Sequence, residues 1–196
     1  MGPRSDADVM AASLEQPAAF GEIFDRHGAG ILRFLVRRVG PEPADQLLGD
    51  TFRIAFERRV TFDRSRDTAA PWLYGIATNL LRRHRRSEGR RLRATARLGA
   101  STDGGQADED RVIAAADAEA LLPAVAEAVL ELPDAERDVL LLFAWEDLAY
   151  DDIAAALDVP VGTVRSRLSR ARQKVRDLLD APGEGMTTTE GARRDR

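Results

Sequence analysis

The stretch YDDIAAALDVPVGTVRSRLSRARQKVRDLL, residues 150–179, decides the fold that this sequence predicts. It begins with a short Ala-rich segment, passes through a turn at residues 158–162 and ends in a longer segment rich in arginine. Two helices joined in this way form a helix-turn-helix, whose second helix lies in the major groove of DNA. Ala154 and Ala155 are small enough for the two helices to cross closely. The stretch therefore predicts a DNA-binding unit.

The longer helix separates apolar from charged side chains when its residues are plotted at about 100° each. Its predicted buried side consists of Val164, Leu168, Ala171, Val175, Leu178 and Leu179. Its edges carry only positive charges, with Arg165, Arg172 and Arg176 on one edge and Arg167, Arg170 and Lys174 on the other. Ser166, Ser169 and Gln173 face away from the buried side. Cations at both edges suit phosphates on the two groove walls, and Arg170 is best placed to reach a guanine.

Apolar residues recur at helical spacing in the first half of the chain as well, and no period-two strand pattern appears. One predicted helix covers residues 20–39 and ends at Gly40-Pro41, and a second follows Pro43. Residues 61–71 form a polar loop closed by a proline, after which a third helix begins at Trp72. This helix runs straight into the basic residues 82–86. The whole pattern predicts an all-α fold.

Charge is distributed very unevenly along the chain, although the net charge is only −4. Residues 82–97 hold eight arginines against one acid, and residues 161–176 hold five arginines and one lysine without an acid. Residues 127–152, by contrast, hold nine acids and one arginine. Such segregation is typical of separate phosphate-binding surfaces, the alternative being solvated charged faces. We therefore predict two basic surfaces, one in each half.

The composition also predicts the domain boundaries. Residues 97–116 include GASTDGGQADED, a Gly-, Ser- and Asp-rich run typical of a flexible acidic linker. We expect two small helical domains, at residues 16–96 and 117–181, on either side of this linker. A flexible N-terminus at residues 1–15 and a disordered polar tail at residues 182–196 complete the predicted organisation.

Several functional classes are disfavoured by what the sequence lacks. It has no cysteine, and its two histidines, His27 and His84, are not in a metal-ligand spacing. No Gly-rich phosphate loop or nucleophile motif occurs, so we expect no enzyme, no cofactor, no metal and no small-molecule substrate. No apolar run approaches the roughly 20 residues of a membrane span, and no signal peptide is recognisable. The expected location is the cytoplasm, with no membrane contact.

Four stretches taken together resemble the extracytoplasmic-function (group IV) sigma factors of the sigma-70 family. They are FGEIFDRHGAGILRFLVRRV, ADQLLGDTFRIAFERR, PWLYGIATNLLRRHRR and LPDAERDVLLLFAWEDLAYDDIAAALDVPVGTVRSRLSRARQKV. The resemblance implies sigma domains 2 and 4 and a polymerase subunit that directs transcription from promoters with −35 and −10 elements. It also implies the partners: core RNA polymerase through its β′ clamp helices and β flap, promoter DNA, and an anti-sigma factor.

The resemblance further implies roles for particular residues. Contacts with core polymerase would come from Asp45, Leu48, Asp50, Phe52, Arg53 and Phe56. This sequence departs from the family pattern at two places: Gly49-Asp50 stands where the family usually has Gln-Glu, and Phe56 stands where Trp is common. The −10 element would be bound by Phe62, Asp63, Arg64, Ser65, Trp72, Asn79, Arg82, Arg83 and Arg86. The −35 element would be read by Thr163, Arg165, Ser166, Arg167, Ser169, Arg170, Arg172 and Lys174. Arg and Asn are chemically suited to these tasks, and the loop at residues 62–65 could hold an unstacked base.

Three alternatives stay open at this point. The acidic linker either enters the RNA path of the polymerase or is a plain solvated tether. Trp72 lies on an apolar stripe, which favours a core position over a stacking platform. Finally, the chain could be a helix-turn-helix regulator that is not a polymerase subunit, but the second basic helix argues against this because a sensory domain needs no second DNA surface.

Overall fold

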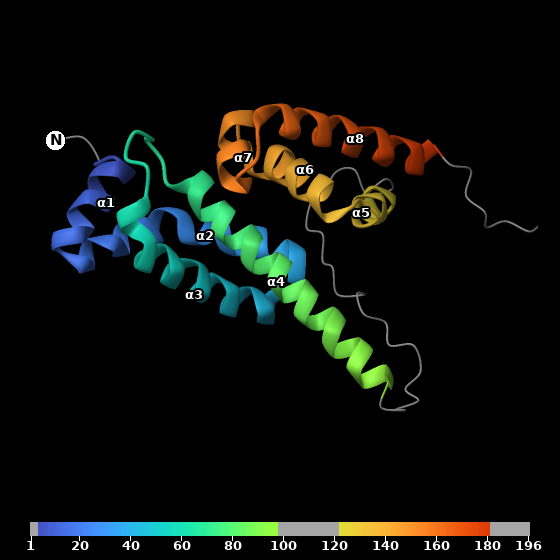
Figure 1. Cartoon of the computed structure of the whole chain (residues 1–196), viewed down its shortest axis with the longest axis horizontal. Helices are drawn as coiled ribbons and strands as arrows, with labels where there is room; N and C mark the ends of the chain where they lie inside the picture. The colour runs from blue at the N-terminus through green and yellow to red at the C-terminus, as the bar shows by residue number, and fades with distance from the viewer. Residues whose placement is uncertain (1–3, 98–121, 181–196) are drawn as a thin grey trace, which may run out of the picture.

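The computed structural model describes residues 4–97 and 122–180, and every regular element in these ranges is a helix, without a strand (Figure 1). The first half comprises α1 (Asp6–Glu15), α2 (Gly21–Val39), α3 (Pro41–Arg58) and α4 (Ala70–Arg97), with short 3₁₀ turns at Pro17–Phe20 and Arg59–Thr61. The second half comprises α5 (Leu122–Leu130), α6 (Asp134–Glu146), α7 (Tyr150–Leu157) and α8 (Val161–Asp180). The all-α prediction is confirmed. The predicted linker and C-terminal tail lie almost wholly outside the described residues.

Helices α2, α3 and α4 pack around the core of the first half. Its largest fully buried side chains include Phe34, Leu35 and Leu73. Gly40 ends α2 with a φ of 77°, a conformation that favours glycine, and Pro41 opens α3 at a position where its missing N–H is not needed. This sharp junction turns α3 back against α2 and leaves α4 to cross them both (Figure 1).

The expected flexible N-terminus is corrected by the structure, because Asp6–Glu15 forms α1 and packs on the first half. Ser5 and Asp8 form a capping box, with the Asp8 N–H donating to Ser5 Oγ at 3.1 Å and the Ser5 N–H donating to Asp8 Oδ2 at 3.2 Å. Val9 and Met10 are buried. A polar cap and two buried apolar side chains are enough to order a short helix against an existing core.

The predicted helix-turn-helix is formed by α7 and α8. Asp158 ends α7 in the left-handed conformation with a φ of 52°, and the Val159 N–H donates back to the Ala154 carbonyl at 3.0 Å. Val164, Leu168 and Ala171 of α8 are buried as predicted. Leu178 and Leu179, by contrast, are 45% and 38% exposed, because the last turns of α8 extend past the helices beneath them (Figure 1).

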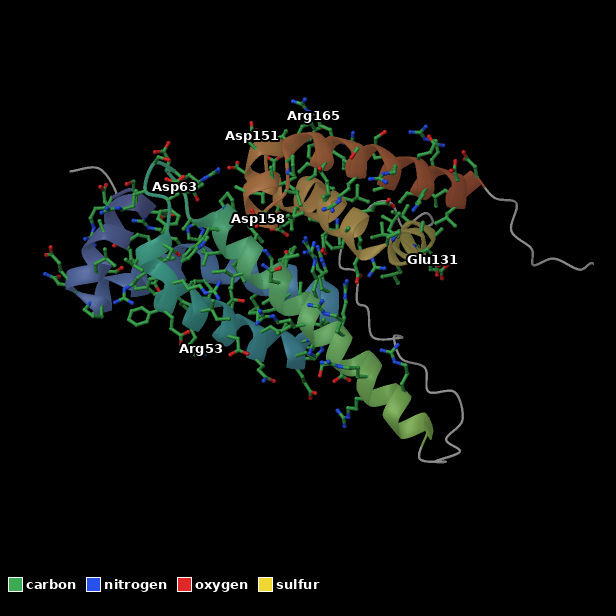
Figure 2. The ribbon with its side chains drawn as sticks, in the orientation of Figure 1. Arg53, Asp63, Glu131, Asp151, Asp158 and Arg165 are labelled. Atoms are coloured by element: carbon green, nitrogen blue, oxygen red, sulfur yellow. The ribbon has the colours of Figure 1, made fainter. Side chains whose placement is uncertain are left out.

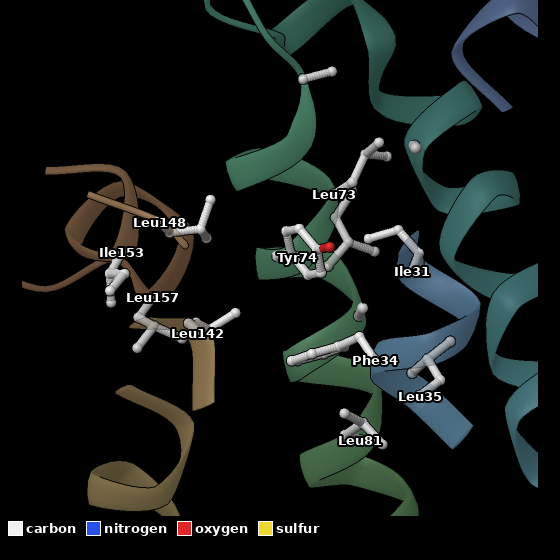
Figure 3. Packing of buried hydrophobic residues seen from close by; sticks show 14 of the residues in the cluster. Ile31, Phe34, Leu35, Leu73, Tyr74, Leu81, Leu142, Leu148, Ile153 and Leu157 are labelled. Atoms are coloured by element: carbon white, nitrogen blue, oxygen red, sulfur yellow. The ribbon is translucent and has the colours of Figure 1, made fainter. Parts of the chain in front are cut away.

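The two halves are packed directly against each other. One continuous apolar core includes Phe34 and Tyr74 of the first half together with Leu142 and Ile153 of the second. Figure 3 shows the side chains of α6 and α7 facing α4 across this junction. The sequence analysis predicted two domains joined by a linker but did not anticipate that they would share a core.

Candidate nucleic-acid interfaces

The outer face of α8 carries most of the residues predicted to read the −35 element. Arg165, Ser166, Ser169 and Arg170 are exposed, as are Arg172 and Lys174, while Thr163 and Arg167 are half-buried. Figure 2 shows Arg165 on the side of α8 that faces away from α4. The face is therefore open to solvent and long enough to lie in a major groove.

Some of these cations are engaged by α6. Lys174 Nζ lies 2.9 Å from a Glu136 carboxylate oxygen, and Arg170 Nε lies 3.7 Å from the other oxygen of the same carboxylate. The Arg172 guanidinium lies 4.9 Å above the centre of the Phe143 ring. Within the described part of the chain, no ion pair holds Arg165 or Arg167. Two cations on the edge of α8 nearest Glu136 are thus tied to α6.

The predicted −10 residues of α4 fall on two neighbouring lines. Asn79, Arg83 and Arg86 are exposed and recur every three or four residues, so they share one face of the helix. Arg82 belongs to the adjacent line, where it is half-buried and its Nε donates to Asp138 Oδ2 of α6 at 2.8 Å. The structure therefore brings three of these side chains together in solvent and turns the fourth toward the second half.

The loop before α4 differs from the expectation at its aromatic residue. Phe62 is 5% exposed and packs on Trp72, with ring centroids 5.5 Å apart, so it supports the loop from beneath instead of lining its surface. Asp63 accepts hydrogen bonds from the Ser65 N–H and hydroxyl at 3.0 and 2.7 Å, and these bonds lower the pKa of Asp63. Arg64 is exposed. The polar half of the loop is available, but Phe62 is not.

The residues predicted to contact polymerase lie along α3. Asp45 and Arg53 are exposed, while Leu48, Asp50 and Phe56 are half-buried. Arg53 bridges Asp50 at 3.1 Å and Glu57 at 2.9 Å, which fixes a charged row on the helix surface. Phe52 is buried, contrary to a direct contact role, and packs edge-on against Phe24 at 4.8 Å.

Phe24 is a residue that the sequence analysis missed. It lies within the helix predicted over residues 20–39, where its helical spacing is that of a buried apolar residue, yet it is 45% exposed beside α3. Only the position of α3 relative to α2 reveals this, and neither helix alone carries a signal for it.

Buried Asp6 links three parts of the first half. It accepts hydrogen bonds from the Ala69 N–H at 2.8 Å and from Arg26 at 2.7 Å, and it lies 2.6 Å from His27 Nε2. Burial raises the pKa of this carboxyl, but the bonds from Ala69, Arg26 and His27 outweigh it and hold the pKa below its ordinary value. Since Ala69 closes the loop before α4, Asp6 fixes the end of that loop.

The described residues lack the features of two other kinds of site. No cluster of three or more metal-binding side chains occurs there. Likewise, none of the described helices is long and apolar enough to cross a membrane.

Comparison with known proteins identifies the two halves separately. The family model of sigma-70 region 2 matches residues 23–91, and that of sigma-70 region 4 matches residues 122–175. RNA polymerase sigma factor CnrH of Cupriavidus metallidurans is 33% identical over 193 residues, which cover 94% of this chain and 100% of CnrH. ECF RNA polymerase sigma factor SigW of Bacillus subtilis is 30% identical over 172 residues, covering 82% of this chain and 89% of SigW. The chain belongs to the ECF RNA polymerase sigma factors.

Solved structures agree with this sigma factor assignment. CnrH in complex with the cytosolic domain of CnrY has a TM-score of 0.62 at 28% identity, covering 91% of this chain and 99% of CnrH. The sigma factor RpoE from Bartonella quintana, solved with the anti-sigma factor NepR, has a TM-score of 0.64 at 23% identity and shares the fold. As a sigma factor, the chain directs promoter-specific initiation by RNA polymerase, and proteins of this kind are generally non-catalytic subunits. A free-standing helix-turn-helix regulator is not favoured.

Proposed function

We propose that this sigma factor divides promoter recognition between its halves, with α8 reading the −35 element and α4 with its preceding loop reading the −10 element. The observation that carries the proposal is the pair of solvent-exposed basic faces, one on each of the two helices. On α8 the small polar residues Ser166 and Ser169 lie between cationic edges, which suits approach to base edges with phosphate contacts on both sides.

In the first half, Asn79, Arg83 and Arg86 form the proposed −10 face, and Asp63, Arg64 and Ser65 provide the polar rim for an unstacked base. Trp72 and Phe62 hold this rim from below, and Arg82 joins the face when it is free of Asp138. The location of the chain would be the cytoplasm, where RNA polymerase acts.

The proposed polymerase contacts lie on α3 and use Asp45, Leu48, Asp50, Arg53 and Phe56 against the β′ clamp helices. Phe52 would act through Phe24, whose exposed ring adds an apolar edge to this surface. The second half would contact the β flap. Residues 97–116 would join the halves as a linker, because a segment of this length reaches about 66–72 Å when fully extended.

A separate protein inhibitor is part of the proposal. CnrH, which aligns with nearly the whole of this chain, was solved with the cytosolic domain of another protein bound to it. Relatives at this level of similarity make a comparable anti-sigma partner the expected regulator here. No cofactor, metal or small-molecule substrate is required for these roles.

The test is run-off transcription with purified core polymerase, with and without the chain. We expect promoter-specific transcripts only when the chain is present. Isolated chain should bind the same promoter duplex poorly, because acidic segments accompany each basic helix and the net charge is −4. Nanomolar binding of the free chain to its promoter at physiological salt, without transcription by the mixture, would instead indicate a free-standing regulator.

A further inference from the structure

The loop before α4 is anchored at its two ends in different ways. At its start, buried Phe62 packs on Trp72, with ring centroids 5.5 Å apart. At its end, the N–H of fully buried Ala69 donates to Asp6 Oδ2 at 2.8 Å. Residues 63–65, to which capture of an unstacked base is assigned above, lie between the two anchors. The base-binding part of the loop thus hangs between an apolar and a polar contact.

The backbone of Ala69 is also where α4 begins. Its carbonyl accepts a helical hydrogen bond from the Leu73 N–H at 3.0 Å, and the next N–H, of Ala70, donates to Thr68 Oγ1 at 3.2 Å. Asp6 serves the Ala69 N–H, so a carboxylate stands at the positive end of α4. The same bond therefore fixes both the end of the loop and the start of the helix that carries the proposed −10 face.

The carboxylate of Asp6 is itself held by two further elements. Asp6 is the first residue of α1, and Val9 and Met10, one turn later, are buried in the core of the first half. From α2, Arg26 Nη1 donates to Asp6 Oδ1 at 2.7 Å, and His27 Nε2 lies 2.6 Å from Oδ2. A buried carboxylate is unfavourable without such partners, and these partners hold it in one orientation.

Asp6 is not placed to contact the promoter directly. Its side chain is 6% exposed, and its two oxygens are occupied by Ala69, Arg26 and His27. The Cα atoms of Ser65 and Ala69, by contrast, are four residues apart and therefore within about 15 Å of each other. A change at Asp6 can thus reach the base-binding part of the loop through the loop backbone alone.

We propose that Asp6 is a positioning residue for −10 recognition: by holding the Ala69 N–H, it keeps the loop before α4 in the shape that accepts an unstacked base. A loop that is ordered beforehand loses less conformational entropy when the base enters. This role deepens the proposed function and rests on it, because it requires that the loop binds a −10 base.

The internal hydrogen bonds of the loop do not replace this anchor. The Ser65 N–H and hydroxyl donate to the Asp63 carboxylate, and the Arg66 N–H donates to the Asp63 carbonyl at 3.2 Å. These bonds shape a turn but do not tie it to a helix. Arg66 also lies 3.0 Å from Asp152 of α7, but both side chains are about one-third exposed, and ion pairs of this kind contribute little.

Backbone order in the free chain tests the positioning. Asp6→Asn keeps the size of the side chain but replaces one acceptor oxygen with an NH2 group that must face donors. The comparison is made with Asp152→Asn in both chains, so that the Arg66 ion pair does not mask the effect. We expect NMR order parameters of residues 63–69 to fall from about 0.85 to about 0.6 or below, while those of α2 stay unchanged.

Arg26→Gln is the second variant, in case Asp6→Asn fails to fold. Arg26 is partly exposed, and its loss weakens the hold on Asp6 without burying a new polar group. It should loosen the loop in the same direction but less. Order parameters of residues 63–69 that stay unchanged in the folded variants overturn the proposal.

Base preference of the holoenzyme tests the effect on recognition. Discrimination at a single base pair is on the order of tenfold or more, and Asp6→Asn should lose most of it at one −10 position while keeping the −35 preferences. A preference is a ratio between promoters, so a smaller folded fraction does not change it. Ile31→Val, which removes one buried methyl group from α2, is the control for lost stability and should keep every preference.

A promoter with an abasic nucleotide at the affected position completes the cycle. The unmodified chain and Asp6→Asn should transcribe it equally, because the ordered loop then has no base to hold. Exposed Arg64→Ala probes the loop itself. If Arg64→Ala alters a −10 preference and Asp6→Asn alters none, or if Ile31→Val reproduces the Asp6→Asn profile, the positioning role is overturned. If neither Arg64→Ala nor Asp6→Asn alters a −10 preference, the proposed function of the loop fails, and this role with it.

Discussion

Arg38 of α2 and Asp138 of α6 are one hundred positions apart in the sequence, yet Arg38 Nη1 lies 2.7 Å from Asp138 Oδ1 and each side chain is 1% exposed. Burial lowers the pKa of Arg38 to about 10, with Asp138 partly restoring it, so the guanidinium is still charged at neutral pH. A charge buried this deeply needs its partner. The pair therefore couples the two halves strongly to each other.

Removing only one member of this pair should open the chain. Asp138→Leu leaves Arg38 buried without a counter-charge, which costs about 3–5 kcal/mol unless the halves separate. Combining Arg38→Leu with Asp138→Leu removes both charges and should restore much of the population in which the two halves are packed together. Arg82, which also loses its partner Asp138, is partly exposed and can turn to water. The distance between spin labels on cysteines introduced at the exposed positions Ser87 and Glu131 measures the separation of the halves. A single variant with the same label distance as the unmodified chain would contradict the coupling.

Neutralising Glu146 should have the opposite effect. Because burial raises the pKa of this carboxyl, the packing of the two halves disfavours its charge, and Glu146→Gln removes that charge while keeping an acceptor for the Tyr74 hydroxyl. We expect a larger fraction of chains in which the two halves are packed together, and therefore weaker apparent binding to core polymerase. Asp147→Asn, at the next position along the chain, is the control. Tighter polymerase binding by Glu146→Gln would show that attraction to Arg37 and Arg33 outweighs desolvation.

Acid should destabilise the first half through Asp6. In the folded chain the pKa of Asp6 is held below the ordinary 3.8. The stabilisation that the ionised carboxyl provides is therefore fully present above pH 3.8 and is lost as the pH falls through the lowered pKa. Asp6→Asn should lower stability at neutral pH and flatten the pH dependence of unfolding below about pH 4. Denaturant unfolding followed by circular dichroism measures this, with exposed Asp25→Asn as the control. Parallel pH profiles for the unmodified chain and Asp6→Asn would remove this role from Asp6.

Base reading and phosphate binding should separate on α8. Arg170→Ala should cost about 1–3 kcal/mol at one −35 position and relax the preference there. Arg165→Ala should weaken all promoters similarly and lower the salt slope by about one unit. The same expectation holds for Arg172→Ala, but that variant also loses the contact with the Phe143 ring, so Arg165 is the cleaner choice. Holoenzyme binding to −35 variants over a salt series distinguishes them. A uniform loss for Arg170→Ala with altered base preference for Arg165→Ala would reverse the orientation of α8.

The sequence predicted the helices and the helix-turn-helix well, because apolar periodicity and turn residues are local signals. The junction at Gly40-Pro41 and the buried side of α8 from Val164 to Ala171 are examples. Contacts between distant segments were not predictable in this way. Nothing near Arg38 indicates that its partner is Asp138, and Gly75 resembles any helical glycine until α7 lies against it. Likewise, α1 was overlooked because its capping box is short and its apolar residues are few.

The most direct test of the division of labour between the halves is transcription by reconstituted holoenzyme from a promoter library randomised at both elements. Arg170→Ala and Asn79→Ala, each exposed on its own helix, are compared with the unmodified chain. Arg170→Ala should change base preference only in the upstream element, and Asn79→Ala only in the downstream one. Changes in the downstream element caused by Arg170→Ala, or in the upstream element caused by Asn79→Ala, would contradict the account.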